Sequence, residues 1–242
     1  MPAKVRRTKK PTVIDIFCGA GGFSEGFRQQ GFKIVRGIDH WAPAMETFNH
    51  NFNLKCPVKD VVDFSSSIEE IEALPDTDII LGSPPCVTFS SSNISGKADK
   101  TEGVTMTQIF LRIVAVKKWK KESILKAWYM ENVPSSIKHL ASEYTFDDLG
   151  LGEWAAKNKL GKSKVAIKLK GNQQIINSAD YGSAQSRERV ISGEIIKKKK
   201  LIIPSSTHSN QAIGFQQKLP WVQLKEIKNK LPLPNSSRSS RS

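Results

Sequence analysis

The sequence has few of the features that mark secreted or membrane proteins. Only three of its 242 residues are cysteines, an odd number that favours reduced thiols over a disulfide framework. No apolar run approaches the ~20 residues that a membrane helix needs, and the basic N-terminus lacks the apolar segment of a secretion signal. We therefore expect an intracellular protein without membrane association.

Acidic residues are also scarce relative to basic ones. The chain has 23 Asp and Glu against 37 Lys and Arg, which leaves a net charge of +14. The basic residues concentrate at Lys4–Lys10, Lys117–Lys121, Lys157–Lys170 and Lys197–Lys200. Any single run is typical of a solvated surface, but the total excess attracts polyanions and favours a nucleic-acid partner.

Length and composition predict one large folded domain with a tail. Hydrophobic residues make up 38% of the chain, enough for a sizeable core. Residues 1–11 resemble a flexible basic arm, and 12–200 carry the folded pattern. Residues 201–234 contain four prolines, and 235–242 are a low-complexity stretch that we expect to be disordered.

Short apolar runs alternate with helical patterns along residues 12–200. This alternation predicts an α/β fold with a doubly wound, mostly parallel sheet, in which ligands bind beyond the carboxyl ends of the strands. The predicted strands are Thr12–Phe17, Lys33–Ile38, Ile79–Leu81, Trp128–Met130, Val165–Leu169 and Arg189–Ile195. The predicted helices are Gly21–Gln30, Ala42–Asn51, Thr107–Lys121 and Val222–Lys230.

A glycine-rich turn follows the first predicted strand. Its glycines permit backbone conformations and close approaches that a side chain would block, although many cofactor families share such a loop. Asp39 ends the second predicted strand. At this position a carboxylate could bind the ribose hydroxyls of a cofactor, or it could cap the helix that follows. Asp60 follows another apolar stretch and could accept a hydrogen bond from an adenine amino group, or be an ordinary loop carboxylate.

Cys86 is the candidate nucleophile. The preceding Pro84 and Pro85 fix the backbone and keep the cysteine out of a regular strand. A free thiol has a pKa of ~8.5, so a site that uses the thiolate must stabilise the anion. A buried structural cysteine is the alternative, and it is the interpretation that we favour for Cys18 and Cys56.

Two further motifs lie near predicted strands. Glu131 ends the Trp128 strand, where a carboxylate could hold or share a proton, unless it is a surface residue. Arg187 and Arg189 lie on one side of an extended segment and suit phosphate or base-oxygen contacts. Salt bridges with Glu188 or Glu194 are the alternative for these arginines.

Together these motifs resemble the DNA cytosine-5 methyltransferases. The shared features run in the family's order from Asp15 to about Ile195. They are Asp15-x-Phe17-x-Gly19-x-Gly21-Gly22, Pro85-Cys86 with Phe89-Ser90, Glu131-Asn132-Val133, the segment 177–182 and Gln185-x-Arg187-x-Arg189. The resemblance implies a Rossmann-like sheet of the S-adenosylmethionine-dependent methyltransferase type, with 12–200 as its catalytic domain.

The resemblance also implies a mechanism. The target cytosine is flipped out of double-stranded DNA, and the Cys86 thiolate attacks C6. Glu131 stabilises the protonated N3, and C5 then accepts a methyl group from S-adenosylmethionine. Arg189 contacts the base O2, Arg187 helps to hold the DNA or the catalytic loop, and Asn132 orients the cysteine loop.

The cofactor site that the family implies contains no metal. Its expected residues are Phe17, Gly19, Ala20, Gly22, Asp39, His40, Asp60, Val61 and Pro85. His40 stands where the family more often has Trp, and the next residue is Trp41, so either ring could stack on the adenine. Val87 and 103–107 also depart from the family pattern.

The family's target-recognition domain and its later motifs are not found in this sequence. We therefore expect 201–234 to begin the connection to that domain, and we expect a second polypeptide to supply the domain, as in a split restriction-modification enzyme. Such an enzyme would be cytoplasmic and associated with the nucleoid, or would lie in the host cell if it came from a virus or phage. An inactive DNA-binding relic and a methyltransferase of tRNA cytosine remain alternatives. A nicotinamide enzyme is more distant, because it has no use for Pro84-Pro85-Cys86 or Glu131-Asn132-Val133.

Overall fold

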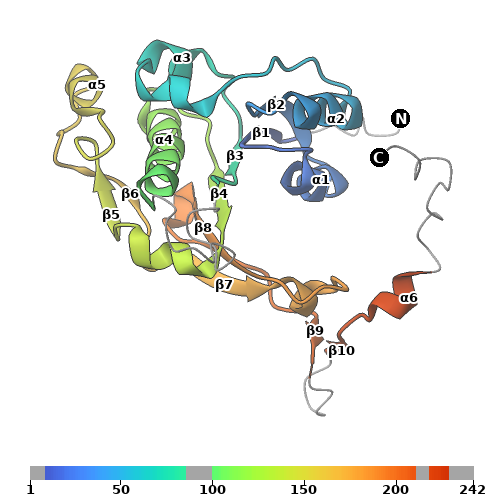
Figure 1. Cartoon of the computed structure of the whole chain (residues 1–242). Helices are drawn as coiled ribbons and strands as arrows, with labels where there is room; N and C mark the ends of the chain where they lie inside the picture. The colour runs from blue at the N-terminus through green and yellow to red at the C-terminus, as the bar shows by residue number, and fades with distance from the viewer. Residues whose placement is uncertain (1–8, 86–99, 211–217, 229–242) are drawn as a thin grey trace, which may run out of the picture. The chain divides into compact units, whose positions relative to one another are not determined.

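The structure is a computed structural model that describes residues 9–85, 100–210 and 218–228. The α-helices are α1 (Gly22–Gln29), α2 (Ala42–Phe52), α3 (Ile68–Ala73), α4 (Lys100–Trp119), α5 (Gly152–Lys157) and α6 (Leu224–Lys228) (Figure 1). The short 3-10 helices are η1 (Val61–Ser65), η2 (Pro134–His139), η3 (Ser178–Tyr181) and η4 (Ile196–Lys198). None of the described helices is long and apolar enough to cross a membrane.

The strands form one six-stranded sheet and two small ones. The strands are β1 (Thr12–Ile16), β2 (Lys33–Ile38), β3 (Ile79–Gly82), β4 (Ala127–Asn132), β5 (Glu143–Thr145), β6 (Val165–Lys168), β7 (Gln173–Asn177), β8 (Glu188–Ile195), β9 (His208–Ser209) and β10 (Leu219–Pro220). The large sheet has the order β2-β1-β3-β4-β8-β7. Strands β2, β1, β3 and β4 are parallel, and β8 runs antiparallel to β4. The mostly parallel α/β sheet predicted from the sequence is therefore confirmed.

The chain divides into two compact units. The first contains residues up to 174 together with 190–202, and the second contains 175–189 together with residues from 203 onward. The first unit includes the parallel strands and α1 to α5, so it holds most of the sequence-predicted site. The second unit includes η3, β9, β10 and α6.

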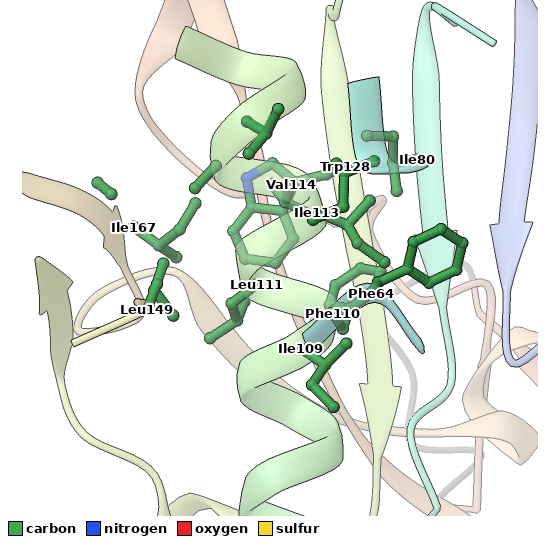
Figure 2. Close-up of a cluster of buried hydrophobic side chains, with 14 of the residues drawn as sticks. Phe64, Ile80, Ile109, Phe110, Leu111, Ile113, Val114, Trp128, Leu149 and Ile167 are labelled. Atoms are coloured by element: carbon green, nitrogen blue, oxygen red, sulfur yellow. The ribbon is translucent and has the colours of Figure 1, made fainter. Parts of the chain in front are cut away.

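One face of the sheet packs against α4. Ile14 and Ile80 point to this face, as does Trp128 of β4, which is completely buried. Phe110 of α4 lies against the Trp128 indole, with ring centroids 6.2 Å apart, and Figure 2 shows both rings in a cluster with Phe64 of η1. Burial of aromatic rings of this size contributes several kcal/mol each, so this cluster anchors the sheet.

The opposite face packs against α1 and α2. Because side chains alternate along a strand, Val13 and Leu81 point away from α4. They belong to a second cluster with Met45 and Phe48 of α2, and Phe27 of α1 packs against its edge. Helices on both faces make the sheet doubly wound, as predicted.

Several predicted elements differ from the structure. The strand expected at Val165–Leu169 exists as β6, but it pairs with β5 in a separate two-stranded sheet. No strand precedes Asp60, which is the N-cap residue of η1. The separate pairing of β6 was not predicted, because a short apolar run shows that a segment is buried, not which strand it pairs with. The tail 235–242 and most of the arm 1–11 lie outside the described residues.

Candidate active site

The carboxyl ends of the parallel strands lie at one edge of the sheet. Ile16 of β1 pairs with Ile38 of β2 and with Gly82 of β3, and Gly82 pairs with Met130 of β4. The chain segments that leave these strands therefore begin side by side. They contain the sequence-predicted residues Phe17, Gly19, Ala20, Gly22, Asp39, His40 and Pro85, while Glu131 and Asn132 are the last two residues of β4.

The turn after β1 has an unusual backbone. Phe17 has φ +59°, a left-handed conformation that costs a bulky residue on the order of 1–3 kcal/mol. The Cys18 N–H donates to the Ile38 carbonyl at 3.1 Å, and the Gly21 N–H donates to the Cys18 carbonyl at 2.9 Å. These bonds hold the turn against the end of β2 and overcome the strain at Phe17.

The glycines of this turn have different tasks. A Cβ on Gly21 would come within 2.3 Å of the Phe52 ring, and Gly21 has φ +96°, so this glycine is required by packing and by backbone conformation. A Cβ on Gly19 or Gly22 would meet nothing within 4 Å. The space beside these two glycines is open, which leaves room for a ligand to approach the backbone closely.

Asp15 is a buried carboxyl group beneath this turn. It is fully buried in β1, and its Oδ2 accepts a hydrogen bond of 2.7 Å from the Ser24 hydroxyl in α1. Burial raises the pKa of Asp15 to about 7, although the bonds from Ser24 partly oppose this. Its Oδ1 has no hydrogen-bond partner. Sequence reasoning used Asp15 only as part of a motif; the signal for a special role was a carboxylate inside an otherwise apolar strand.

Asp39 joins the glycine-rich turn to the start of α2. Its Oδ2 accepts from the Gly19 N–H at 2.9 Å, and its Oδ1 accepts from the Trp41 N–H at 2.9 Å. Trp41, not Asp39, is the N-cap residue of α2, and no side chain caps this helix. The carboxylate therefore fixes the turn beside the open space at Gly19 and does not act as the helix cap considered from the sequence.

The residues around Asp39 and η1 offer a mixed surface. The rings of His40 and Trp41 are both well exposed, with the Trp41 residue 62% accessible. Asp60 is exposed and accepts from the Val62 N–H at 3.0 Å, as the cap of η1. The Val61 side chain is buried in the core, so only its backbone could contact a ligand.

Asn132 holds the segment that leads to the candidate nucleophile. It is almost fully buried at the end of β4, and its Nδ2 donates to the Pro84 carbonyl at 3.4 Å. Its Oδ1 accepts from the Val133 N–H at 2.8 Å. The first bond holds the backbone of the proline segment that precedes position 86, and the second fixes the Asn132 side chain against the backbone of Val133. Cys86 itself, with Phe89 and Ser90, lies outside the described residues.

Glu131 lies next to this segment. It is half-buried and pairs with Ile191 in the antiparallel ladder of β4 and β8. Because Met130 pairs with Gly82, Glu131 lies level with the residues that follow β3. The carboxylate and the proline segment thus come from adjacent strand ends.

The second unit contains the two candidate arginines. Asn177 holds their loop: its Oδ1 accepts from the Arg187 N–H at 3.0 Å, and its Nδ2 donates to Ser186 Oγ at 2.9 Å. Arg187 is exposed, and Arg189 donates to the Glu188 carbonyl at 2.6 Å. In the described part of the chain, Glu194 instead pairs with Lys118, so the proposed salt bridge from Glu194 to an arginine is not present.

Cys18 and Cys56 are structural, as predicted. Both are buried, and Cys56 Sγ accepts from the Gly37 N–H at 3.4 Å. Burial, with smaller effects from nearby Asp15 and Asp39, raises the pKa of the Cys18 thiol far above its usual value. The Cys18 thiol is therefore not suited to nucleophilic chemistry near neutral pH.

Comparison with known sequences points to one family. A sequence model of the family described as C-5 cytosine-specific DNA methylase matches residues 11–238. The type II methyltransferase M.HgiGI of Herpetosiphon aurantiacus is 38% identical over 123 residues, which are 50% of this chain and 89% of that protein. The type II methyltransferase M.DdeI of Desulfomicrobium norvegicum is 31% identical over 182 residues, which are 74% of this chain and 39% of that protein.

Comparison with solved structures agrees on the fold. A prophage-encoded protein of E. coli, described provisionally as a DNA modification methyltransferase, matches with a TM-score of 0.56 at 23% identity. The match covers 93% of this chain and 56% of that protein. Apart from M.HgiGI, the chain spans well under two thirds of these relatives' length.

Proposed function

The chain belongs to the C-5 cytosine-specific DNA methylase family, and from this premise we propose that it transfers a methyl group from S-adenosylmethionine to C5 of cytosine in DNA. One observation carries the proposal furthest. The glycine-rich turn, the Pro84–Pro85 segment and Glu131 all leave the same edge of one parallel sheet. This arrangement supports a site at which a cofactor and a base would be held side by side.

The residues at this edge fit S-adenosylmethionine. The open space beside Gly19 and Gly22 admits a ligand against the backbone, and the unpartnered Oδ1 of Asp15 lies beneath the same turn. Asp39 would bind the ribose hydroxyls, and His40 or Trp41 would stack on the adenine. Phe17 and Ala20, with Asp60, the Val61 backbone and Pro85, would complete the site. The bound cofactor supplies an electrophilic methyl group.

The chain's own residues activate the base. The Cys86 thiolate adds to C6 of the flipped cytosine, which makes C5 electron-rich. Glu131 holds the proton at N3 and accepts from the exocyclic amine. Once C5 carries the methyl group, its proton passes to a solvent water, the C5–C6 double bond re-forms, and the Cys86 thiolate leaves C6. Asn132 is a positioning residue, since its bond to the Pro84 carbonyl fixes the backbone just before Cys86.

The arginines and lysines hold the DNA. Arg189 contacts the base O2, and Arg187 contacts the DNA or the catalytic loop. Both suit this role because the planar guanidinium group makes paired hydrogen bonds. The net charge of +14 adds a salt-dependent attraction to the phosphate backbone.

The finer proposal concerns DNA-sequence recognition. We propose that a second polypeptide supplies it and that the pair acts as the modification enzyme of a restriction-modification system. The type II methyltransferases among the relatives support the second part. The proposal of a second polypeptide rests on the order of the sequence motifs alone.

Transfer of labelled methyl groups tests the function. The purified chain, with and without the product of the adjoining gene, is incubated with labelled S-adenosylmethionine and duplex DNA, and the methylated base is identified by mass spectrometry. We expect 5-methylcytosine, a loss of activity to background in Cys86→Ser, and a loss of at least about 100-fold in Glu131→Gln.

Matched controls separate the alternatives. Cys56→Ser changes a buried structural thiol and should retain activity. A tRNA substrate in competition with DNA tests the RNA alternative, and preferential methylation of tRNA would refute the choice of DNA. Normal cofactor binding without methylation in any pairing would favour the inactive relic.

A further inference from the structure

The loop that carries Arg187 connects two strands. Strand β7 ends at Asn177, β8 begins at Glu188, and the short helix η3 opens the connection between them. Among residues 178–187, only Ala179 is buried, and Arg187 is exposed. A segment with so little apolar burial is held mainly by its hydrogen bonds, so these bonds decide where the arginine lies.

Both backbone polar groups of Arg187 are bonded to the start of this connection. The Arg187 N–H donates to Asn177 Oδ1 at 3.0 Å, and the Arg187 carbonyl accepts from the Ser178 N–H at 3.0 Å. The residues just before the arginine are held in the same way. Asn177 Nδ2 donates to Ser186 Oγ at 2.9 Å, and the Ser178 hydroxyl donates to the Gln185 carbonyl at 2.6 Å.

The Asn177 side chain also caps η3. Its Oδ1 accepts from the Ala179 N–H at 3.0 Å, so one amide group joins the first turn of η3 to the Arg187 backbone. Asparagine suits this task because its side chain can accept and donate hydrogen bonds at once. The direction in which η3 lies therefore determines the position of Arg187.

The other end of η3 is bonded to residues that follow position 203. Asp180 Oδ1 accepts from the Trp221 indole N–H at 2.9 Å, and the Asp180 carbonyl accepts from the Thr207 N–H at 3.0 Å. The Tyr181 hydroxyl donates to the Pro204 carbonyl at 3.0 Å. The second unit thus holds η3 from both ends, with the arginine loop bonded at one of them.

We propose that Asn177 is a positioning residue for Arg187, and that η3, braced by the bond between Asp180 and Trp221, holds this arginine in place to contact a DNA phosphate. The inference rests on the proposed function, in which Arg187 contacts DNA. A guanidinium group binds phosphate through paired hydrogen bonds, which require a defined direction of approach. A backbone that is fixed before binding loses less conformational entropy when the contact forms.

A double-mutant cycle in DNA affinity tests this role. Binding of a fluorescein-labelled duplex to the full chain is measured by anisotropy at several salt concentrations, for the wild type, Asn177→Ala, Arg187→Ala and the double variant. We expect Arg187→Ala to weaken binding by about tenfold and to reduce the salt dependence by about one phosphate contact. Asn177→Ala should weaken binding by about fivefold and also reduce the salt dependence, because the arginine is no longer held at the phosphate. The double variant should bind as Arg187→Ala does, because Asn177 acts only through the arginine.

Asn158→Ala is the matched control. Asn158 follows α5 in the first unit, and its Nδ2 donates to the Trp154 carbonyl at 2.9 Å, so the variant loses a similar amide bond away from the arginine loop. It should bind DNA as the wild type does. If Asn177→Ala fails to fold, Trp221→Phe keeps an aromatic ring but loses the donor to Asp180. It should also weaken binding, and only while Arg187 is present.

The outcomes separate this role from the proposed function. Additive losses in the cycle, or an Asn177→Ala protein with the affinity and salt dependence of the wild type, would overturn the positioning role even if the wild type methylates cytosine. Unchanged binding by Arg187→Ala would overturn it as well. A wild type that binds DNA but transfers no methyl group in any pairing would instead refute the proposed function, and the cycle would still decide the role of Asn177.

Discussion

Replacing Gly21 by alanine tests the account of the glycine-rich turn. The new Cβ would lie 2.3 Å from Cε2 of Phe52 and 3.0 Å from Cδ2 of Phe48. The left-handed backbone at Gly21 costs an alanine about 1 kcal/mol, and overpacking costs about 1–3 kcal/mol more. Because Phe52 is half-buried and can shift, we expect a loss of about 2–3 kcal/mol in the free energy of unfolding.

Gly22→Ala is the matched control, one residue away. Gly22 begins α1, has no positive φ, and a Cβ there meets nothing within 4 Å. Alanine favours helix over glycine by about 0.5–1 kcal/mol, so stability should hold or rise slightly. The same Cβ enters the proposed cofactor space, so S-adenosylmethionine affinity should fall. Urea unfolding and titration calorimetry measure the two effects. Equal stability losses in both variants, or a Gly21→Ala protein as stable as the wild type, would refute the reasoning.

Three further predictions follow from buried polar groups. Burial raises the pKa of Asp15 to about 7, so the folded state binds more protons than the unfolded state between about pH 4 and 7, and stability falls as pH rises through this window. Asp15→Asn should remove this fall. In urea unfolding, the wild type should lose a few kcal/mol in the free energy of unfolding between pH 5 and pH 8, and the variant should not. Glu194→Ala leaves Lys118 without its partner in a largely buried place, and should lower the free energy of unfolding by about 3 kcal/mol. Adding Lys118→Met should recover much of this loss, because it removes the unpaired charge. Asn132→Ala removes the hydrogen bonds to Pro84 and Val133, and should lower the free energy of unfolding by about 1–3 kcal/mol. It should also lower kcat more than it raises KM.

Each of these has a contradicting result. An unchanged pH profile in Asp15→Asn would show that another group carries the titration. A double variant no more stable than Glu194→Ala would show that the loss comes from packing. If Asn132→Ala changed KM alone, the residue would not position the loop that leads to Cys86.

The central sheet could be predicted because its strands are short apolar runs that end in recognisable loops. Lys33–Ile38 was predicted with the bounds of β2, and the edge shared by Asp39 and Glu131 follows from strand order. The glycine-rich turn was found for a physical reason, because positive φ at Gly19 and Gly21 limits the residue type.

Other features depend on contacts that sequence spacing does not reveal. The pairing of β6 with β5 needs a partner strand that is three residues long. The burial of Arg112 in α4 depends on which loop folds over this helix, since its Nη1 donates to the Leu149 and Gly150 carbonyls. Asp60 follows an apolar stretch in the sequence, but its role as the cap of η1 depends on the 3-10 helix that follows. In each case, tertiary packing decides what the local pattern leaves open.

Trapping of the enzyme–DNA adduct tests the central claim most directly. Duplex DNA with 5-fluorocytosine at the target position is incubated with the chain, its partner if one is needed, and S-adenosylmethionine, and the product is analysed by denaturing electrophoresis and mass spectrometry. Because fluorine at C5 blocks the release step, we predict a stable adduct that carries the transferred methyl group and maps to Cys86, absent in Cys86→Ser. An adduct at another residue, or methylated DNA from Cys86→Ser, would contradict the account.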